Sequence, residues 1–200
     1  MATPKVVTEL LQRSNRLGSE PRFTNYAGGN TSAKGSIPNP ATGQETTVLW
    51  VKGSGGDLGT LTESGLAALD LEKFKALKNV YRGIDHEDEM VALFDYCRFG
   101  IGGAAPSIDT TMHGLVPFDH VDHLHPDSII ALATSVDGEK LTRECFGDEI
   151  LWVDWRRPGF QLGLDMERIA SENPKAKGCI LGGHGLTTWG ATSKIGRAHV

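Results

Sequence analysis

Hydrophobic and polar positions follow two patterns along the chain, helical spacing in some segments and short continuous apolar runs in others. Three leucines lie among polar residues over 8–17, which predicts a weakly amphipathic helix that ends at Gly18. The run 46–51 (TTVLWV) predicts a strand. Between these segments, residues 22–44 are rich in Gly, Asn, Ser, Thr and Pro, and we expect a loop region there.

Further helices and strands are expected after this strand. Thr60 and Glu63 have the spacing of a capping box and leucines recur behind them, which predicts a helix toward Phe74. Pro126 and Asp127 open another helix. The same patterns predict helices over 86–99, after Asp109 and near 165–171, and strands over 121–125, over 150–154 and on both sides of His184.

Strands and helices alternate throughout, and neither an internal repeat nor a low-complexity linker divides the chain. This alternation favours an α/β or α+β class with helices packed against a central sheet. We expect a single α/β domain, and the family resemblance described below implies that its sheet is mostly antiparallel. The last six residues, 195–200 (IGRAHV), look like the translation of a sequencing adapter. We therefore expect a domain over 1–194 that is incomplete at its C-terminus, followed by a non-native tail, with a true C-terminus as the alternative.

Composition and charge exclude several classes of protein. With 39% hydrophobic and 22% charged residues, the chain resembles a globular protein rather than a disordered or collagen-like one. A net charge of -5 with scattered Lys and Arg argues against a nucleic-acid partner. No apolar run approaches the roughly 18 residues of a membrane span, and three cysteines at irregular spacing suggest a reducing compartment. We expect a cytoplasmic protein without a membrane partner.

Histidines provide the strongest chemical signal in the sequence. His120, His123 and His125 fall within six positions, and His184 lies between two glycines. On a strand, His123 and His125 project from the same face, and His184 could reach them from a neighbouring strand. Three neutral imidazoles with one open coordination position are typical of a catalytic zinc ion acting as a Lewis acid. The alternative is a set of surface or hydrogen-bonded core histidines.

Two glycine-rich loops contain the kinds of groups that bind anions. They are residues 28–32 (GGNTS) and 52–56 (KGSGG). Each offers free backbone N–H groups and hydroxyls within five residues, which can bind an anion through converging dipoles. Neither loop matches the phosphate loop of nucleotide hydrolases, and residues 53–59 have the wrong spacing for a dinucleotide fingerprint. As an alternative, both are ordinary turns.

A carboxylate at Asp109 is the preferred candidate for acid/base chemistry near the metal. It follows Pro106, Ser107 and Ile108 just before a predicted helix, so Ser107 or Asp109 could equally be a helix N-cap. Other carboxylates rank lower as solvated charges, namely Asp57, Asp119, Asp122 and Glu144.

Taken in order, the motifs GGNTS, KGSGG, PSID followed by a histidine, HVDHLHP and GGHGL resemble the class II aldolase/adducin family over residues 22–192. The segments HVDHLHPDSIIALA and GDEILWVDWRRPGFQLG look most like the aldolase half of bifunctional rhamnulose-1-phosphate aldolase/short-chain dehydrogenase proteins. The resemblance implies a zinc-dependent lyase. Its reaction would cleave L-rhamnulose 1-phosphate, a ketose 1-phosphate, into dihydroxyacetone phosphate and L-lactaldehyde.

The resemblance also implies roles for individual residues. The metal ligands would be His123, His125 and His184, with one Zn²⁺ per chain, and Asp109 would be the catalytic acid/base. The small sugar-phosphate aldolases have glutamate at the position of Asp109 and a second serine at that of Ile108. The phosphate positions would be Asn30, Ser54, Gly55 and Ser107, flanked by Gly29 and Thr31.

Partners and rival functions follow from the same resemblance. The family forms homo-oligomers, commonly tetramers, around small phosphorylated sugars. Because the family's C-terminal helix and the dehydrogenase half are missing after Lys194, we expect no NAD binding by this chain. A further alternative is a truncated fragment that assembles poorly and is inactive. The rivals are a pentulose-phosphate epimerase, a dehydratase and a non-catalytic adducin-like binding module. Such modules lose the metal histidines, which this sequence keeps.

Overall fold

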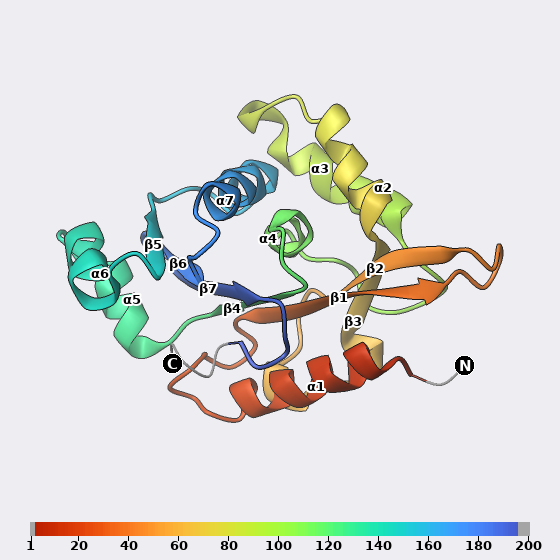
Figure 1. The fold of residues 1–200 in the computed structure, drawn as a ribbon, viewed down its shortest axis with the longest axis horizontal. Coiled ribbons are helices and arrows are strands. Elements are labelled where there is room, and N and C mark those ends of the chain that lie inside the picture. Colours follow the sequence, from red (N-terminus) through yellow and green to blue (C-terminus); the bar gives the residue numbers. More distant parts are fainter. Residues whose placement is uncertain (1–2, 196–200) are drawn as a thin grey trace.

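A seven-stranded sheet forms the centre of the computed structural model, which describes residues 3–195 (Figure 1). The strand order is β3-β2-β1-β4-β7-β6-β5, and every neighbouring pair is antiparallel except β5 and β6. This confirms the expected α/β fold with a mostly antiparallel sheet. The strands are β1 (Asn30–Pro38), β2 (Glu45–Lys52), β3 (Leu66–Asp70), β4 (His120–Leu124), β5 (Ile150–Val153), β6 (Gly178–Leu181) and β7 (Gly185–Gly190).

Helices cover both faces of the sheet. Figure 1 shows α1 below the sheet and α4 and α7 above it, with α2 and α3 beside them and α5 and α6 next to β5. The bounds are α1 (Lys5–Gly18), α2 (Leu71–Ala76), α3 (Glu87–Leu93), α4 (Thr110–Leu115), α5 (Asp127–Ala133), α6 (Gly138–Phe146) and α7 (Phe160–Glu172). Short 3₁₀ turns occupy Leu58–Thr60, Glu63–Gly65, Leu77–Asn79, Ile84–His86 and Phe94–Cys97.

The prediction of a loop over 22–44 was wrong for β1, which lies near the middle of the sheet. This strand pairs with β2 on one side and with β4 on the other. Its first residues, Asn30, Thr31 and Ser32, are polar but buried, because their side chains bond to α1, α4 and the neighbouring loops. Composition signalled a loop, but tertiary hydrogen bonds satisfy these polar groups inside the protein.

The predicted helix from Thr60 toward Phe74 was also wrong over most of its length. Residues 66–70 form β3, which pairs with β2, and α2 begins only at Leu71. Asp70 caps this helix, since its side chain accepts hydrogen bonds from the backbone N–H groups of Glu72 and Lys73. Short apolar runs of this kind are ambiguous between helix and strand until a neighbouring strand is known.

Other elements agree with the sequence patterns except at their ends. The helix predicted over 86–99 stops at Leu93 and continues as a 3₁₀ turn, and the helix predicted near 165–171 begins earlier, at Phe160. Buried Glu87 of α3 caps this N-terminus by accepting the backbone N–H groups of Phe160 and Gln161. The helix α6 was not predicted.

The tail expected to be non-native, 195–200, falls almost entirely outside the described residues, so the proposed domain end at Lys194 remains a prediction. In the described part, residues 3–195, no helix combines the length and apolar character needed to cross a membrane.

Candidate metal centre

Three histidines meet at one end of β4. His123 lies within this strand, His125 follows it, and His184 occupies the turn between β6 and β7. Because β4 pairs with β7, with His123 opposite Thr187, the turn that carries His184 lies beside the end of β4. The potential ligand atoms all lie within 4.8 Å of one another. The sheet therefore unites histidines that are distant in sequence.

Hydrogen bonds fix which nitrogen two of these rings present. His123 Nδ1 lies 3.1 Å from the carbonyl oxygen of Leu186, and His125 Nδ1 lies 3.0 Å from Asn25 Oδ1. Both partners are acceptors, so each Nδ1 carries the proton and each Nε2 keeps a free lone pair. Oxygen acceptors of this kind typically orient metal-bound histidines.

Nε2 of His123 and Nε2 of His125 are 3.0 Å apart. Two lone pairs facing each other at this distance repel unless a cation or a proton lies between them. Tetrahedral zinc, with Zn–N bonds of about 2.0 Å, places two nitrogens about 3.3 Å apart. Burial lowers the pKa of His123, His125 and His184, which favours the neutral, metal-binding form. The three residues thus fit a divalent metal ion.

Asp109 lies at the N-terminus of α4, close to the histidines. Its charge raises the pKa of His125 and His184 against the larger opposing effect of burial. The Asp109 side chain caps no backbone N–H, and its Oδ2 instead accepts a hydrogen bond of 2.8 Å from Asn30 Nδ2. The structure therefore brings Asp109 and Asn30 together beside the histidines.

The two loops that carry Ser54 and Ser107 lie side by side. Ser54 N donates to Ala105 O at 2.9 Å, and a Cβ on Gly53 would lie 2.3 Å from Ala104 Cβ, so only glycine allows this approach. Ser54 and Gly55 are exposed at the tip of their loop. Ser107 Oγ is buried and has no hydrogen-bond partner among residues 3–195. An orphaned hydroxyl of this kind is available to an oxygen-rich ligand.

Lys52, at the end of β2, is a residue of this region that the sequence analysis did not single out. Its side chain is 4% exposed, and burial lowers its pKa while the charges of Asp109 and Asp57 oppose that effect. The available signal was a lysine directly before the glycine loop. The structure shows that the Lys52 side chain is buried near the loops instead of extending into solvent.

The flanking residues Gly29 and Thr31 differ in their relation to the histidines: Gly29 lies against the backbone of His123, whereas the Thr31 side chain lies on the other face of the sheet. Gly29 has a φ of +68°, and a Cβ there would lie 2.8 Å from the carbonyl oxygen of His123, so it lets the two segments approach. The Thr31 hydroxyl is not brought to the histidines. It lies 2.7 Å from Ser14 Oγ of α1, on the opposite face of the sheet from Asn30. Alternation along a strand is the physical reason.

One of the lower-ranked carboxylates differs from expectation. Asp122 is not a solvated charge, because it is 1% exposed and pairs with Arg13 of α1 at 3.0 Å. Asp57 is partly buried and accepts the backbone N–H groups of Ala27 and Gly59. Asp119 and Glu144 are exposed, as expected.

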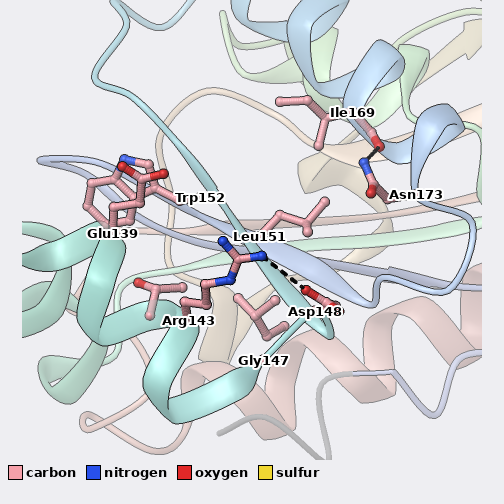
Figure 2. Close-up of a pocket in the computed structure, with 10 residues that line it drawn as sticks. Glu139, Arg143, Gly147, Asp148, Leu151, Trp152, Ile169 and Asn173 are labelled. Atoms are coloured by element: carbon pink, nitrogen blue, oxygen red, sulfur yellow. Dashed lines mark hydrogen bonds and ion pairs between the residues drawn. The ribbon is translucent and has the colours of Figure 1, made fainter.

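A separate cavity of about 330 Å³ lies between α6, β5 and α7 (Figure 2). Leu151 and Trp152 line it together with an ion pair between Arg143 and Asp148, whose N–O distance is 4.0 Å. None of the three clustered histidines lines this cavity. The candidate chemistry therefore lies at the end of β4 and not here.

Comparison with known proteins agrees with this fold. A domain of a conserved Thermoplasma acidophilum protein, described as its N-terminal class II aldolase domain, superposes with a TM-score of 0.84 at 27% identity, covering 98% of this chain and 88% of that chain. The L-fuculose-1-phosphate aldolase of Thermus thermophilus shares the fold, with a TM-score of 0.55, 16% identity and coverage of 94% and 80%.

A curated relative from Bacillus subtilis (strain 168), called uncharacterized oxidoreductase YuxG, is 38% identical over 191 residues. That match covers 96% of this chain but only 27% of the relative, so the chain spans about a quarter of the relative's length. Residues 9–195 match the family described as Class II Aldolase and Adducin N-terminal domain. The chain therefore belongs to the class II aldolase and adducin family.

Proposed function

We propose that this chain is a zinc-dependent aldolase that cleaves a ketose 1-phosphate. Our preferred substrate is L-rhamnulose 1-phosphate, and its products would be dihydroxyacetone phosphate and L-lactaldehyde. The observation that carries the proposal is the histidine cluster, in which His123 and His125 present free Nε2 atoms 3.0 Å apart. The Asp109 carboxylate beside it supports an acid/base role.

His123, His125 and His184 would hold the metal ion through their ring nitrogens. When bound, this ion would act as a Lewis acid and stabilise negative charge on the substrate's oxygens as the carbon–carbon bond breaks. The histidines are neutral in their buried environment, so they contribute no charge of their own. Their arrangement leaves a coordination position for the substrate.

The phosphate end of the substrate would be held by groups between the two loops. Ser107 Oγ has no partner within residues 3–195 and can donate to a phosphate oxygen. Lys52 supplies a cation in the same region, and the exposed glycine loop offers the backbone at Ser54 and Gly55. Binding energy from this non-reacting end would position the carbon–carbon bond near the histidines.

Asp109 would move the proton. Its Oδ2 accepts from Asn30, which leaves Oδ1 to take the proton of the hydroxyl next to the bond that breaks. The electrons of that bond pass to the neighbouring carbon, and the hydroxyl carbon becomes the aldehyde. Asp109 then returns a proton to the carbon that received the electrons, so the carboxylate is restored.

The comparisons support the reaction class more than the sugar. The Thermus L-fuculose-1-phosphate aldolase shares the fold, and its low identity leaves the sugar open. YuxG is called an oxidoreductase, and we infer that this activity resides in the part of YuxG that the chain does not match. We therefore propose that these 200 residues do not bind NAD. We also propose a cytoplasmic location and a homo-oligomer, preferably a tetramer.

Metal content and product analysis test the proposal. Mass spectrometry of the purified chain should find about one zinc per chain, lost in His123→Ala and in His184→Ala. His120→Ala is the matched control, because His120 is also buried in β4 but faces Arg13. With L-rhamnulose 1-phosphate, the metal-loaded protein should release two three-carbon products. Folded wild-type protein that takes up no metal would contradict the proposal, and an epimerised or dehydrated product would replace it with one of the rival activities.

A further inference from the structure

His113 of α4 is a fully buried histidine that the proposed reaction does not use directly. Both of its ring nitrogens are hydrogen-bonded to residues of β1. Nδ1 lies 2.7 Å from Ser32 Oγ, and Nε2 contacts Asn30 Oδ1. Asn30 in turn donates to Asp109 at 2.8 Å. The four side chains form one continuous chain of hydrogen bonds that ends at Asp109.

Only one arrangement of protons satisfies this chain with a neutral imidazole. Because Asn30 Nδ2 donates to the Asp109 carboxylate, Asn30 Oδ1 faces His113 and accepts from Nε2–H. Nδ1 is then the acceptor, and the Ser32 hydroxyl donates to it at 2.7 Å rather than to the more distant carbonyl oxygen of Val121 at 3.3 Å. Burial lowers the pKa of His113 to about 3, followed by a smaller effect of the Lys34 charge, which keeps the ring neutral.

The orientation of the Asn30 amide follows from this tautomer. The oxygen and the NH₂ group of a carboxamide have nearly the same size, so the group can rotate by a half-turn without a steric clash. In Asn30 this rotation would direct Oδ1 toward the Asp109 carboxylate, and the two acceptors would repel each other. The Nε2–H of His113 stabilises the oxygen on the other side and so opposes that rotation. The second N–H of Asn30 remains for a ligand oxygen, because an amide nitrogen carries two hydrogens.

We propose that His113 is a positioning residue for the reaction, acting through Asn30 to hold Asp109 in the geometry that proton transfer requires. This inference rests on the proposed function for the role of Asp109, but its structural part does not. Fixing a catalytic group through neighbours that have their own hydrogen bonds is a general way to keep it within a fraction of an ångström.

Three variants separate positioning from general stability. His113→Phe keeps a ring of similar size but removes both hydrogen bonds, and His113→Gln restores one amide donor toward Asn30. His120→Phe is the matched control, because it removes another buried histidine that faces Arg13 on the opposite side of the sheet. The side-chain amide signals of Asn30 in ¹⁵N-asparagine-labelled protein report the geometry without activity, and Asn30→Ser assigns them.

In the wild type we expect slow exchange of the Asn30 amide hydrogens with water. Exchange should be about 10-fold faster in His113→Phe, as for an opened hydrogen bond worth about 1.4 kcal/mol, return toward the wild-type rate in His113→Gln, and stay unchanged in His120→Phe. The kcat of sugar-phosphate cleavage should fall about 10- to 100-fold in His113→Phe alone. Loss of thermal stability should be similar in the two Phe variants.

Wild-type exchange and kcat in folded His113→Phe would overturn the inference. If that variant does not fold, Ser32→Ala provides the second test, because it removes only the hydroxyl that donates to Nδ1 and should raise Asn30 exchange in the same direction. A wild-type protein that cleaves no ketose phosphate would refute the proposed function, and the amide measurement would still decide whether His113 positions Asn30.

Discussion

The two faces of the sheet at β1 and β4 both carry buried polar side chains, but they differ in how these side chains are satisfied. On the α1 face, all three guanidinium nitrogens of Arg13 donate hydrogen bonds, among them one to Asp122 and one to the carbonyl oxygen of Ser32. On the α4 face, His123 and His125 direct free nitrogens at each other, and Ser107 keeps a buried hydroxyl without a partner among the described residues.

This is the difference expected between a structural polar cluster and a site for ligands. The α1 cluster has protein partners for its cation, although Asp122 Oδ2 lacks one within residues 3–195. The groups of the α4 face are oriented by neighbours such as Asn25 and Asn30 but are left with unused acceptor and donor capacity. Buried polar groups cost free energy when unpaired, so unused capacity at several adjacent residues points to a bound ligand.

The largest expected effect is on stability at the α1 face. Arg13→Met should lower the free energy of unfolding by about 3–5 kcal/mol, because it leaves Asp122 buried without its cation. Urea titration of metal-free protein measures this loss, and Arg13→Met combined with Asp122→Leu should recover much of it. Folded Arg13→Met should still bind one zinc. An unchanged urea midpoint in Arg13→Met would show that the two clusters do not differ in the way described.

The next effect concerns a residue that orients one of the proposed metal ligands. Asn25→Ala removes the oxygen that accepts from His125 Nδ1, so zinc affinity should fall about 10- to 100-fold. Stability should change little, because Asn25 is exposed. Competition with a zinc chelator gives the affinity. Asn39→Ala, at a half-buried asparagine whose side chain also accepts one hydrogen bond, is the control and should match the wild type. Equal affinity in both variants would remove Asn25 from the site.

Protonation of the buried histidines should destabilise both faces in acid, whereas Asp122 on the α1 face opposes this effect, because burial raises its pKa to about 6. Burial lowers the pKa of His120 to about 4 and that of His113 to about 3, whereas an unfolded histidine titrates near about 6.5. Below about pH 6.5 the unfolded chain therefore binds protons that the folded chain does not. Their contribution to stability is complete above that pH and is lost as the pH falls toward about 4.

Urea titrations of metal-free protein between about pH 4 and about pH 7.5 measure this slope. His120→Gln should reduce it by roughly 1 kcal/mol per pH unit, since one fewer group titrates. His86→Gln, at a more exposed histidine, serves as the control. A slope in His120→Gln equal to that of the wild type would mean that His120 is protonated in the folded protein.

The smallest stability effect is expected at Ser107. Its hydroxyl has no protein partner among residues 3–195, so Ser107→Ala should change the free energy of unfolding by less than about 0.5 kcal/mol. Inorganic phosphate should nevertheless bind about 10-fold more weakly, because a hydrogen bond to a charged ligand is lost. Calorimetry measures both quantities, with Ser135→Ala as the surface control. A clear loss of stability with unchanged phosphate binding would show that Ser107 stabilises the fold and does not bind the ligand.

The sequence alone predicted the fold class and the clustering of His123, His125 and His184, but not every element around them. The spacing of His123 and His125 requires only a strand to bring both rings to one face, and the structure provides that strand as β4. The glycine loops and Asp109 were also recognisable, because glycine and a pre-helical carboxylate have local conformational roles. The roles given to these residues in catalysis remain predictions.

Only the tertiary structure decided the placement of polar residues that depend on distant partners. Alternation along β1 puts Asn30 and Thr31 on opposite faces, but only the neighbours that β1 acquires in the sheet decide that Asn30 reaches Asp109 and that Thr31 faces α1. Asn25 orients a histidine 100 positions away for the same reason. A sequence pattern reports local periodicity, whereas the burial and pairing of a polar group are set by segments that only folding brings into contact.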